Sequence, residues 1–122
     1  MRPHTKRVLC VDDDDDTCSM LCGLLGLVGC EASAAGTAAE ALEAIAGGGF
    51  NLYLLDNWLP GGSGLELCRK IRETDPSTPI VFYSGADRES EREEALAAGA
   101  QAYLVKPGDV AALVETVRRL LR

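Results

Sequence analysis

Short apolar runs alternate with stretches of helical spacing from one end of the chain to the other. Each run ends at charged residues, Gly or Pro. The first apolar run is typical of a strand that is buried on both faces of a sheet. The predicted strands are residues 7–12, 30–35, 50–55, 79–84 and 101–105.

Between these runs, apolar residues recur every three or four positions, which is the period of a helix with one buried face. Thr37 and Ser63 are each followed three residues later by a glutamate, a pattern that predicts a capped helix start. The helix predicted over residues 88–98 differs from the others, because its first half has almost nothing apolar to bury. The other predicted helices are 17–28, the stretch from Thr37 to the glycines at 47–49, the stretch from Ser63 to Asp75-Pro76, and the stretch from near Asp109 to Leu121.

Strands and helices in this alternation predict an α/β fold, namely a doubly wound five-stranded parallel sheet with five helices on its two faces. A chain of 122 residues has the length of one domain, and we predict a single domain over residues 1–122. Ligands of such sheets bind at the carboxyl ends of the strands, where the winding reverses. Functional residues are therefore expected at these strand ends.

The chain is acidic, with a net charge of −7, and 5% of its residues are aromatic. The charge argues against a general affinity for nucleic acid or acidic membrane surfaces, and the shortage of aromatic residues argues against stacking of bases. No apolar run approaches the roughly 20 residues of a membrane span, and no signal-peptide pattern opens the sequence. We therefore expect a cytoplasmic protein whose domain binds neither nucleic acid nor membrane.

The five cysteines, an odd number, are expected to be small buried hydrophobes in a reducing compartment. Cys18 and Cys22 lie four residues apart on one predicted helix face, but no histidine or second cysteine pair completes a zinc site in the sequence. His4, the sole histidine, lies in a polar leader and is expected to be a tail residue rather than a phosphodonor.

Four of the predicted strands end in groups suited to phosphoryl chemistry. Asp12 and Asp13 follow the first strand, Asp56 the third, Ser84 the fourth and Lys106 the fifth. Up to three carboxylates are expected within a few ångströms of one another, where they repel unless a cation compensates. Mg²⁺ prefers carboxylate, carbonyl, water and phosphate oxygens, so the sequence predicts a magnesium site.

Helix N-capping is an alternative interpretation of the aspartate run, since negative charge is favourable at a helix start. It accounts for Asp14, Asp15 and Asp16, but it explains neither Asp56 nor Lys106.

Asp56 has two interpretations of its own. It is either an ordinary turn acid or a nucleophile that attacks a phosphoryl donor and forms an acyl phosphate. In the second case a metal offsets charge on the transferred group, Lys106 pairs with a phosphate oxygen, and the Ser84 hydroxyl donates to another. Four such signals in this order along alternating strands and helices favour the nucleophile.

The chain resembles the receiver domain of bacterial two-component response regulators over essentially its whole length. The matching pieces are VLCVDDD (8–14), LYLLDNWLPGGSGLEL (52–67), PIVFYSGAD (79–87) and GAQAYLVKP (99–107). The resemblance implies the flavodoxin-like strand order 2-1-3-4-5. It also implies a signalling switch that a histidine kinase or phosphotransfer protein phosphorylates, and that catalyses its own phosphotransfer and dephosphorylation. The partner or output domain would be contacted through the face formed by residues 88–121.

The resemblance assigns roles at the metal site residue by residue. Asp56 would be the phosphoacceptor, and Asp12 and Asp13 the acidic pair for Mg²⁺. The backbone carbonyl of Trp58 would be a further ligand. The Trp58 side chain is bulky for a position that lies beside the phosphate in this family and affects its hydrolysis.

Three other residues match the family's remaining functional positions. Ser84 falls on the switch serine or threonine, Lys106 on the lysine and Tyr103 on the switch aromatic. Tyr103 also has a plainer interpretation as a half-buried aromatic of the sheet. Gly85 stands where the family usually has a small residue such as Ala, and Gly108 stands where many members have Phe.

Two other functions fit part of the sequence. Residues 13–17 contain the D-x-D-x-T nucleophile motif of haloacid-dehalogenase-type phosphohydrolases, but the later acidic metal pair is missing and Asp56 has no role in that reaction. A receiver that binds partners without turning over phosphate usually lacks an acid or the lysine, and neither is lost here.

Overall fold

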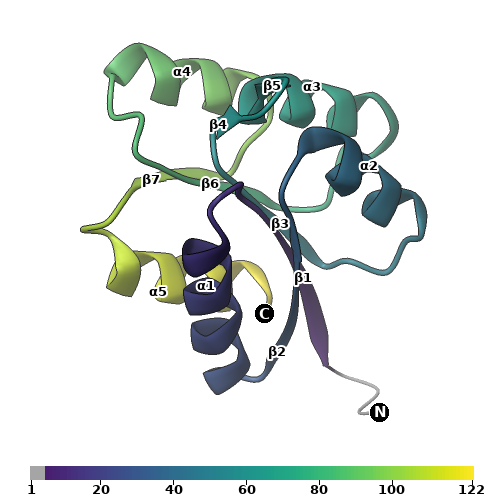
Figure 1. Cartoon of the computed structure of the whole chain (residues 1–122), viewed down its shortest axis with the longest axis vertical. Helices are drawn as coiled ribbons and strands as arrows, with labels where there is room; N and C mark the ends of the chain where they lie inside the picture. The colour runs from purple at the N-terminus through teal and green to yellow at the C-terminus, as the bar shows by residue number, and fades with distance from the viewer. Residues whose placement is uncertain (1–4) are drawn as a thin grey trace.

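The computed structural model describes residues 5–122, which form a five-stranded parallel sheet with helices on both faces (Figure 1). The strands of this sheet are β1 (Lys6–Val11), β2 (Cys30–Ala35), β3 (Leu52–Leu55), β6 (Ile80–Ser84) and β7 (Ala102–Val105). The helices are α1 (Asp15–Leu27), α2 (Ala38–Ala46), α3 (Gly64–Thr74), α4 (Glu89–Ala97) and α5 (Val110–Leu120). Within residues 5–122, none of the helices is long and apolar enough to cross a bilayer. His4 lies outside the described residues, so its predicted role stays a prediction.

The strands lie side by side in the order β2-β1-β3-β6-β7, and all neighbours in this sheet are parallel. Numbered along the chain within the sheet, this is the order 2-1-3-4-5, so the predicted doubly wound α/β fold is confirmed. Helices α2, α3 and α4 cover one face of the sheet, and α1 and α5 cover the other (Figure 1). The winding reverses between β1 and β3, which places the ligand-binding crevice at their carboxyl ends.

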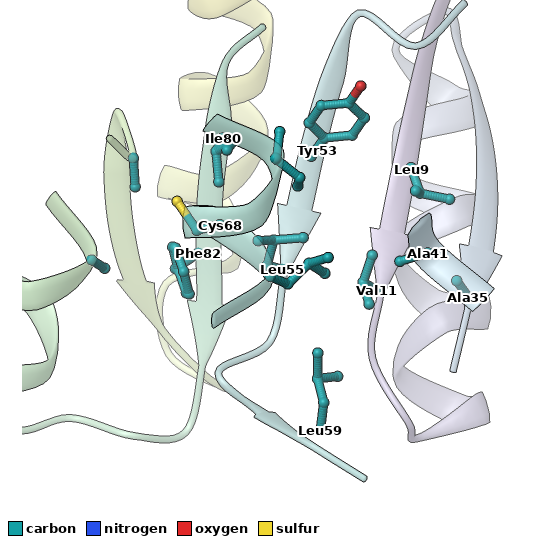
Figure 2. Packing of buried hydrophobic residues seen from close by; sticks show 14 of the residues in the cluster. Leu9, Val11, Ala35, Ala41, Tyr53, Leu55, Leu59, Cys68, Ile80 and Phe82 are labelled. Carbon is teal, nitrogen blue, oxygen red and sulfur yellow. The ribbon is translucent and has the colours of Figure 1, made fainter. Parts of the chain in front are cut away.

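Side chains alternate along the central strands between two cores, one beneath each helix layer. Leu9, Leu55 and Phe82 point into the core under α2, α3 and α4 (Figure 2). Cys10 and Leu54 point the other way, into the core under α1 and α5. Because both faces of these strands are buried, the sequence shows continuous apolar runs rather than a polar alternation.

A small antiparallel hairpin after β3 is a feature that was not predicted. Its strands, β4 (Trp58–Leu59) and β5 (Gly62–Ser63), are too short to give a periodic pattern in the sequence. Gly61 turns the chain between them with a φ of 75°, a conformation that favours glycine. Leu59 is buried and holds the hairpin against the domain.

Most element ends differ from the predicted ones by one or two residues, and local hydrogen bonds explain two details. The third strand begins two residues later than predicted because Asn51 Oδ1 accepts from the Arg7 amide at 2.8 Å. Thr37 caps α2 as predicted, accepting from the Glu40 amide at 3.1 Å. The Glu40 carboxylate, however, accepts from the Gly36 amide rather than from the amide of the cap residue.

Helix α4 is attached to the core mainly through its C-terminal end. Within residues 89–97, Ala95 is the one buried residue, and Leu96 is 42% exposed. The Arg72 guanidinium of α3 donates to the Gly99 carbonyl at 2.8 Å from Nη2 and at 3.2 Å from Nε. The charged N-terminal half has little packing to oppose its opening.

We expect the N-terminal half of α4 to be the part of the helical layer that opens most readily. Native-state hydrogen exchange should be faster at residues 89–93 than at residues 113–117 of α5, because Leu113 and Val117 are fully buried. Exchange monitored by two-dimensional NMR tests this. Equal protection in the two segments would show that contacts of the charged side chains hold α4 as firmly as a buried apolar face.

Candidate functional site

The pairing of β1 with β3 brings Asp12 and Asp56 together. Val11 and Leu55, the last residues of these strands, are register partners, and the Asp56 amide donates to the Val11 carbonyl at 2.8 Å. The acid that follows each strand therefore lies in the crevice at the carboxyl edge. Asp12 is 3% exposed and Asp56 is 5% exposed, so both carboxylates have lost most of their water.

Lys106 supplies the counter-charge for both acids. Its amide donates to the Ser84 carbonyl at 3.0 Å, which places it at the end of β7 beside the end of β6. Its Nζ lies 2.8 Å from Oδ2 of Asp12 and 3.2 Å from Oδ2 of Asp56. Burial lowers the pKa of Lys106, but the hydrogen bonds and charges of the two carboxylates outweigh this, so its pKa is raised above the ordinary value. The lysine is therefore a firmly charged ammonium shared by two acids.

Asp13 completes a group of three acids. An oxygen from each of Asp12, Asp13 and Asp56 lies within 4.8 Å of the others, which no other trio of His, Cys, Asp or Glu does in residues 5–122. Asp13 is exposed whereas the other two are buried, so the group opens to solvent on one side. Hard carboxylate oxygens with room for water are the donors that Mg²⁺ takes in proteins, and these residues fit that ion.

The rest of the aspartate run serves the start of α1. Asp14 is the N-cap residue, its amide donates to Oδ1 of Asp12 at 2.9 Å, and its carboxylate accepts from the Thr17 hydroxyl at 2.6 Å. Asp15 and Asp16 lie in the first turn, where negative charge is favourable. The three acids therefore lie at the helix start as predicted, but the Asp14 carboxylate bonds the Thr17 hydroxyl rather than a backbone amide of the helix.

The Asp56 carboxylate is held in an unfavourable environment for its charge. Burial raises its pKa above the ordinary value for an aspartate, and the charge of Asp12 raises it further. The Ser84 hydroxyl and Lys106 act in the opposite direction without cancelling the effect of burial. Any additional positive charge or hydrogen-bond donor that reaches the site would therefore stabilise the charged form of the Asp56 carboxylate.

Ser84 and Tyr103 lie on neighbouring strands beside the acids. Ser84 is completely buried at the end of β6, and its Oγ accepts from the Ala86 amide at 3.2 Å. The Tyr103 ring stacks on Phe82 at a centroid distance of 5.5 Å, and its hydroxyl donates to the Ala86 carbonyl. Tyr103 is 1% exposed, so its interpretation as a half-buried aromatic is wrong.

Trp58 lies on the rim of the site and is 63% exposed. Its amide approaches Oδ1 of Asp56 at 3.4 Å. Its ring lies beside Gly85, since a Cβ added to that glycine would be 3.8 Å from ring atom Cζ3. The indole therefore flanks the entrance to the carboxylates, while the role of its backbone carbonyl as a ligand stays a prediction.

Asn57 is a buried residue of the site that the sequence analysis did not single out. It is 9% exposed, and its two oxygens accept from the first two amides of α3. The Gly64 amide donates to its carbonyl at 2.9 Å, and the Leu65 amide donates to its Oδ1 at 3.0 Å. A short amide side chain next to the predicted nucleophile, in a loop that leads to a helix start, is the sequence signal that marks it.

The chain belongs to the response regulator receiver domain family, whose model matches residues 8–118. The response regulator MprA of Mycobacterium leprae is 38% identical over 116 residues, which cover 95% of this chain and 51% of that protein. The phosphate regulon transcriptional regulatory protein PhoB of Rhizobium meliloti is 44% identical over 75 residues, covering 59% of this chain and 33% of that protein. The chain thus spans between a third and about half of the length of these relatives.

Solved structures confirm the same family at the level of the fold. A two-component response regulator from Clostridium difficile has a TM-score of 0.91 and 31% identity, with 97% of each chain covered. TrrA from Thermotoga maritima, solved in complex with Mg²⁺-BeF, has a TM-score of 0.86 and 31% identity, with 95% of this chain and 99% of that chain covered. The predicted receiver family is therefore confirmed, which favours it over the phosphohydrolase alternative.

Removing the charge of Asp56 is expected to stabilise the fold. Because its pKa is raised in the folded state, ionisation costs folding free energy at every pH above that pKa. Asp56→Asn should raise the free energy of unfolding at neutral pH by about 1 kcal/mol in the absence of divalent cations. As the pH falls through the raised pKa to below the ordinary value of an aspartate, the wild-type carboxyl is protonated in both states and the gain should vanish.

Urea denaturation at neutral pH and at about pH 3 measures this difference. Asp87→Asn is the matched control, because Asp87 is an exposed acid outside the carboxylate group and its removal should leave stability nearly unchanged. An Asp56→Asn protein that is less stable than wild type at neutral pH would show that the contact with Lys106 outweighs the cost of burying the charge.

Proposed function

We infer that this receiver domain acts as the signalling switch of a response regulator. We propose that residues 1–122 form a single receiver domain whose phosphoacceptor is Asp56, phosphorylated by a histidine kinase or a phosphotransfer protein. The observation that supports this best is the Lys106 ammonium shared between Asp12 and Asp56. A carboxylate with a cation on one oxygen and two further acids beside it supports attack on a phosphoryl group at this position.

In the proposed reaction an Asp56 carboxylate oxygen attacks the phosphorus of the donor. The new O–P bond forms as the bond between phosphorus and the donor nitrogen breaks, and the electron pair of that bond stays on the nitrogen. Lys106 Nζ, which contacts two carboxylates in this structure, pairs with a phosphoryl oxygen. The Ser84 hydroxyl, buried at the end of β6 beside the strand that Asp56 follows, donates to another phosphoryl oxygen.

We further propose that Asp12, Asp13, Asp56 and the backbone carbonyl of Trp58 hold Mg²⁺. When bound, the ion supplies positive charge that stabilises the phosphoryl oxygens as charge develops on them. The close grouping of the three carboxylates supports this, and so does the presence of Mg²⁺-BeF in the similar TrrA structure.

The same groups serve self-catalysed dephosphorylation in this proposal, with water attacking the phosphorus and the Asp56 carboxylate leaving. The exposed Trp58 ring beside Gly85 limits the approach of that water. A receiver that only binds partners is not favoured, because the acids, the lysine and the serine are all present and Lys106 contacts both Asp12 and Asp56.

For the output, we propose a partner or output domain that contacts the face formed by residues 88–121, with Ser84 and Tyr103 as the switch residues. MprA and PhoB, the relatives described above, are named a response regulator and a transcriptional regulatory protein, and this chain covers only part of each. The net charge of −7 supports a receiver that leaves any contact with nucleic acid to another domain.

Acetyl phosphate with Mg²⁺ should add one labile phosphoryl group to the domain, because an acyl phosphate is hydrolysed in both acid and base. Intact-protein mass spectrometry should show the adduct in wild type and in the Asp87→Asn control, and it should be absent from Asp56→Asn. The reason is that Asp56 is a buried carboxylate that contacts Lys106 and follows the central strand β3, beside the other two acids of the group. Asp56→Asn protein that labels to the wild-type extent would remove the proposed phosphoacceptor.

Mg²⁺ should stabilise the folded domain, because it binds the native acid group but not the dispersed unfolded chain. Millimolar Mg²⁺ is expected to raise the melting temperature of wild type by about 5 °C. The rise should be much smaller in Asp13→Asn, which removes a donor, and unchanged in Asp16→Asn, which removes an acid of the α1 first turn outside the group. The same response in all three proteins would contradict the proposed metal site.

A further inference from the structure

A cavity of about 320 Å³ lies at the edge of the sheet opposite the carboxylates. It is found where β1 and β2 begin, since Lys6 and Cys30, the first residues of these strands, are register partners and both line it. The turn after α1 and the end of α5 supply the rest of its lining. The six residues of β1, about 20 Å of extended chain, separate the cavity from Asp12. A molecule bound here would therefore leave the phosphoacceptor edge open.

Three cationic side chains surround this cavity. Lys6, Arg118 and Arg122 are exposed and line it. The ion pairs within residues 5–122 involve Arg7 and Lys106, and none involves these three side chains. Cations are favourable at the C-terminal end of a helix, which accounts for the two arginines of α5 but neither for Lys6 on β1 nor for the cavity between them. In a chain with a net charge of −7, this is a local concentration of unpaired positive charge.

The wall between the cations is partly apolar. Val28 and Leu121 are half-buried residues that line the cavity. Leu27, which directly precedes Val28, is 84% exposed at the end of α1. An apolar side chain that enters the cavity would remove part of this surface from water. The cavity therefore combines an apolar wall with a cationic rim.

The ends of two helices indicate which kind of anion fits. The C-terminal ends of α1 and α5 both border the cavity, and these are the negative ends of the helix dipoles. They oppose a compact, multiply charged anion at the centre. Carboxylates spaced along a peptide can instead pair with the cations on the rim, where the arginine fork accommodates a carboxylate on two nitrogens. The arrangement favours an acidic peptide over a phosphate.

We propose that this cavity is a docking site for an acidic peptide segment of a partner protein. The segment carries an apolar side chain between carboxylates, so that the apolar group occupies the cavity and the carboxylates meet Lys6, Arg118 and Arg122. This site goes beyond the proposed phosphoryl chemistry. The partner and the phosphodonor would contact opposite edges of the sheet, so both can occupy the domain at the same time.

The test titrates ¹⁵N-labelled domain at low salt with the acetylated and amidated peptide Glu-Glu-Leu-Glu-Glu. Amide chemical shifts should change at residues 28–30 and 118–122 and stay constant at Asp56. The same peptide with serine in place of leucine should bind about tenfold more weakly, because it lacks the apolar group. The peptide with glutamine in place of every glutamate should show no binding. Equal binding of the glutamine peptide overturns the proposal.

Arg118→Gln and Lys6→Gln should each raise the Kd of the peptide about two- to fivefold, as expected for exposed ion pairs. Arg69→Gln is the matched control, because Arg69 is an exposed arginine of α3 outside the cavity and its replacement makes the same change in net charge. The control should bind like wild type. Equal weakening in Arg69→Gln, or wild-type affinity in both cavity variants, overturns the proposal.

Three further measurements identify a different occupant, and each positive result overturns the peptide. Pyrophosphate that binds the cavity more tightly than the peptide would indicate a site for compact anions. Cosedimentation with phosphatidylglycerol vesicles that is lost in Arg118→Gln would indicate a membrane surface. Self-association in sedimentation velocity that is lost in Arg118→Gln would indicate a second copy of the chain. None of these experiments uses phosphorylation, so their outcome is independent of the proposed role of Asp56.

Discussion

Two buried carboxylates share one ammonium group at the carboxyl edge of the sheet, and the chemistry of the domain depends on that arrangement. Asp12 and Asp56 are both buried, so water does little to screen the repulsion between their charges. The positive charge of Lys106 Nζ, which contacts both carboxylates, offsets that repulsion. With Asp13 the site holds three acids against one lysine, so a negative charge remains. This remaining negative charge favours a divalent cation, which in the function that we propose would offset the charge of the phosphoryl group.

The fold fixes this arrangement through the parallel register rather than through the loops. β1 and β3 end in step, so the acids that follow them cannot separate without breaking the ladder. β7 lies beyond β6 from these two strands, so its cation must reach across a strand to the acids. Lysine has a long, flexible stem with a point charge at its end, which suits this reach better than a short side chain would. Ser84 ends β6, the strand between β3 and β7, and therefore lies between the strand of Asp56 and the strand of Lys106.

The sequence allowed the elements and the acids to be predicted for a physical reason. Strands buried on both faces must be apolar throughout, and parallel strands must expose their polar end groups at a common edge, so Asp12, Asp56, Ser84 and Lys106 could be named in advance. The β4–β5 hairpin could not, since two-residue strands have no period. The burial of Tyr103 and the contacts of Asn57 also escaped prediction. Both depend on which of several hydrogen-bond partners a side chain selects in the folded core, which residue type and spacing do not determine.

In the function that we propose, contacts of Ser84 and Tyr103 with one loop would carry a local change at Asp56 to α4. The Tyr103 hydroxyl is bonded to the Ala86 carbonyl, and Ser84 Oγ to the Ala86 amide, so both side chains contact the loop that leads into this helix. The C-terminal end of α4 is fixed, because two nitrogens of Arg72 donate to the Gly99 carbonyl that follows the helix. A helix fixed at its C-terminal end and weakly packed at its N-terminal end responds to a shift of the preceding loop by pivoting rather than by sliding. The charged N-terminal half of α4 contributes no buried residue, so little packing opposes its movement with the loop after Ser84.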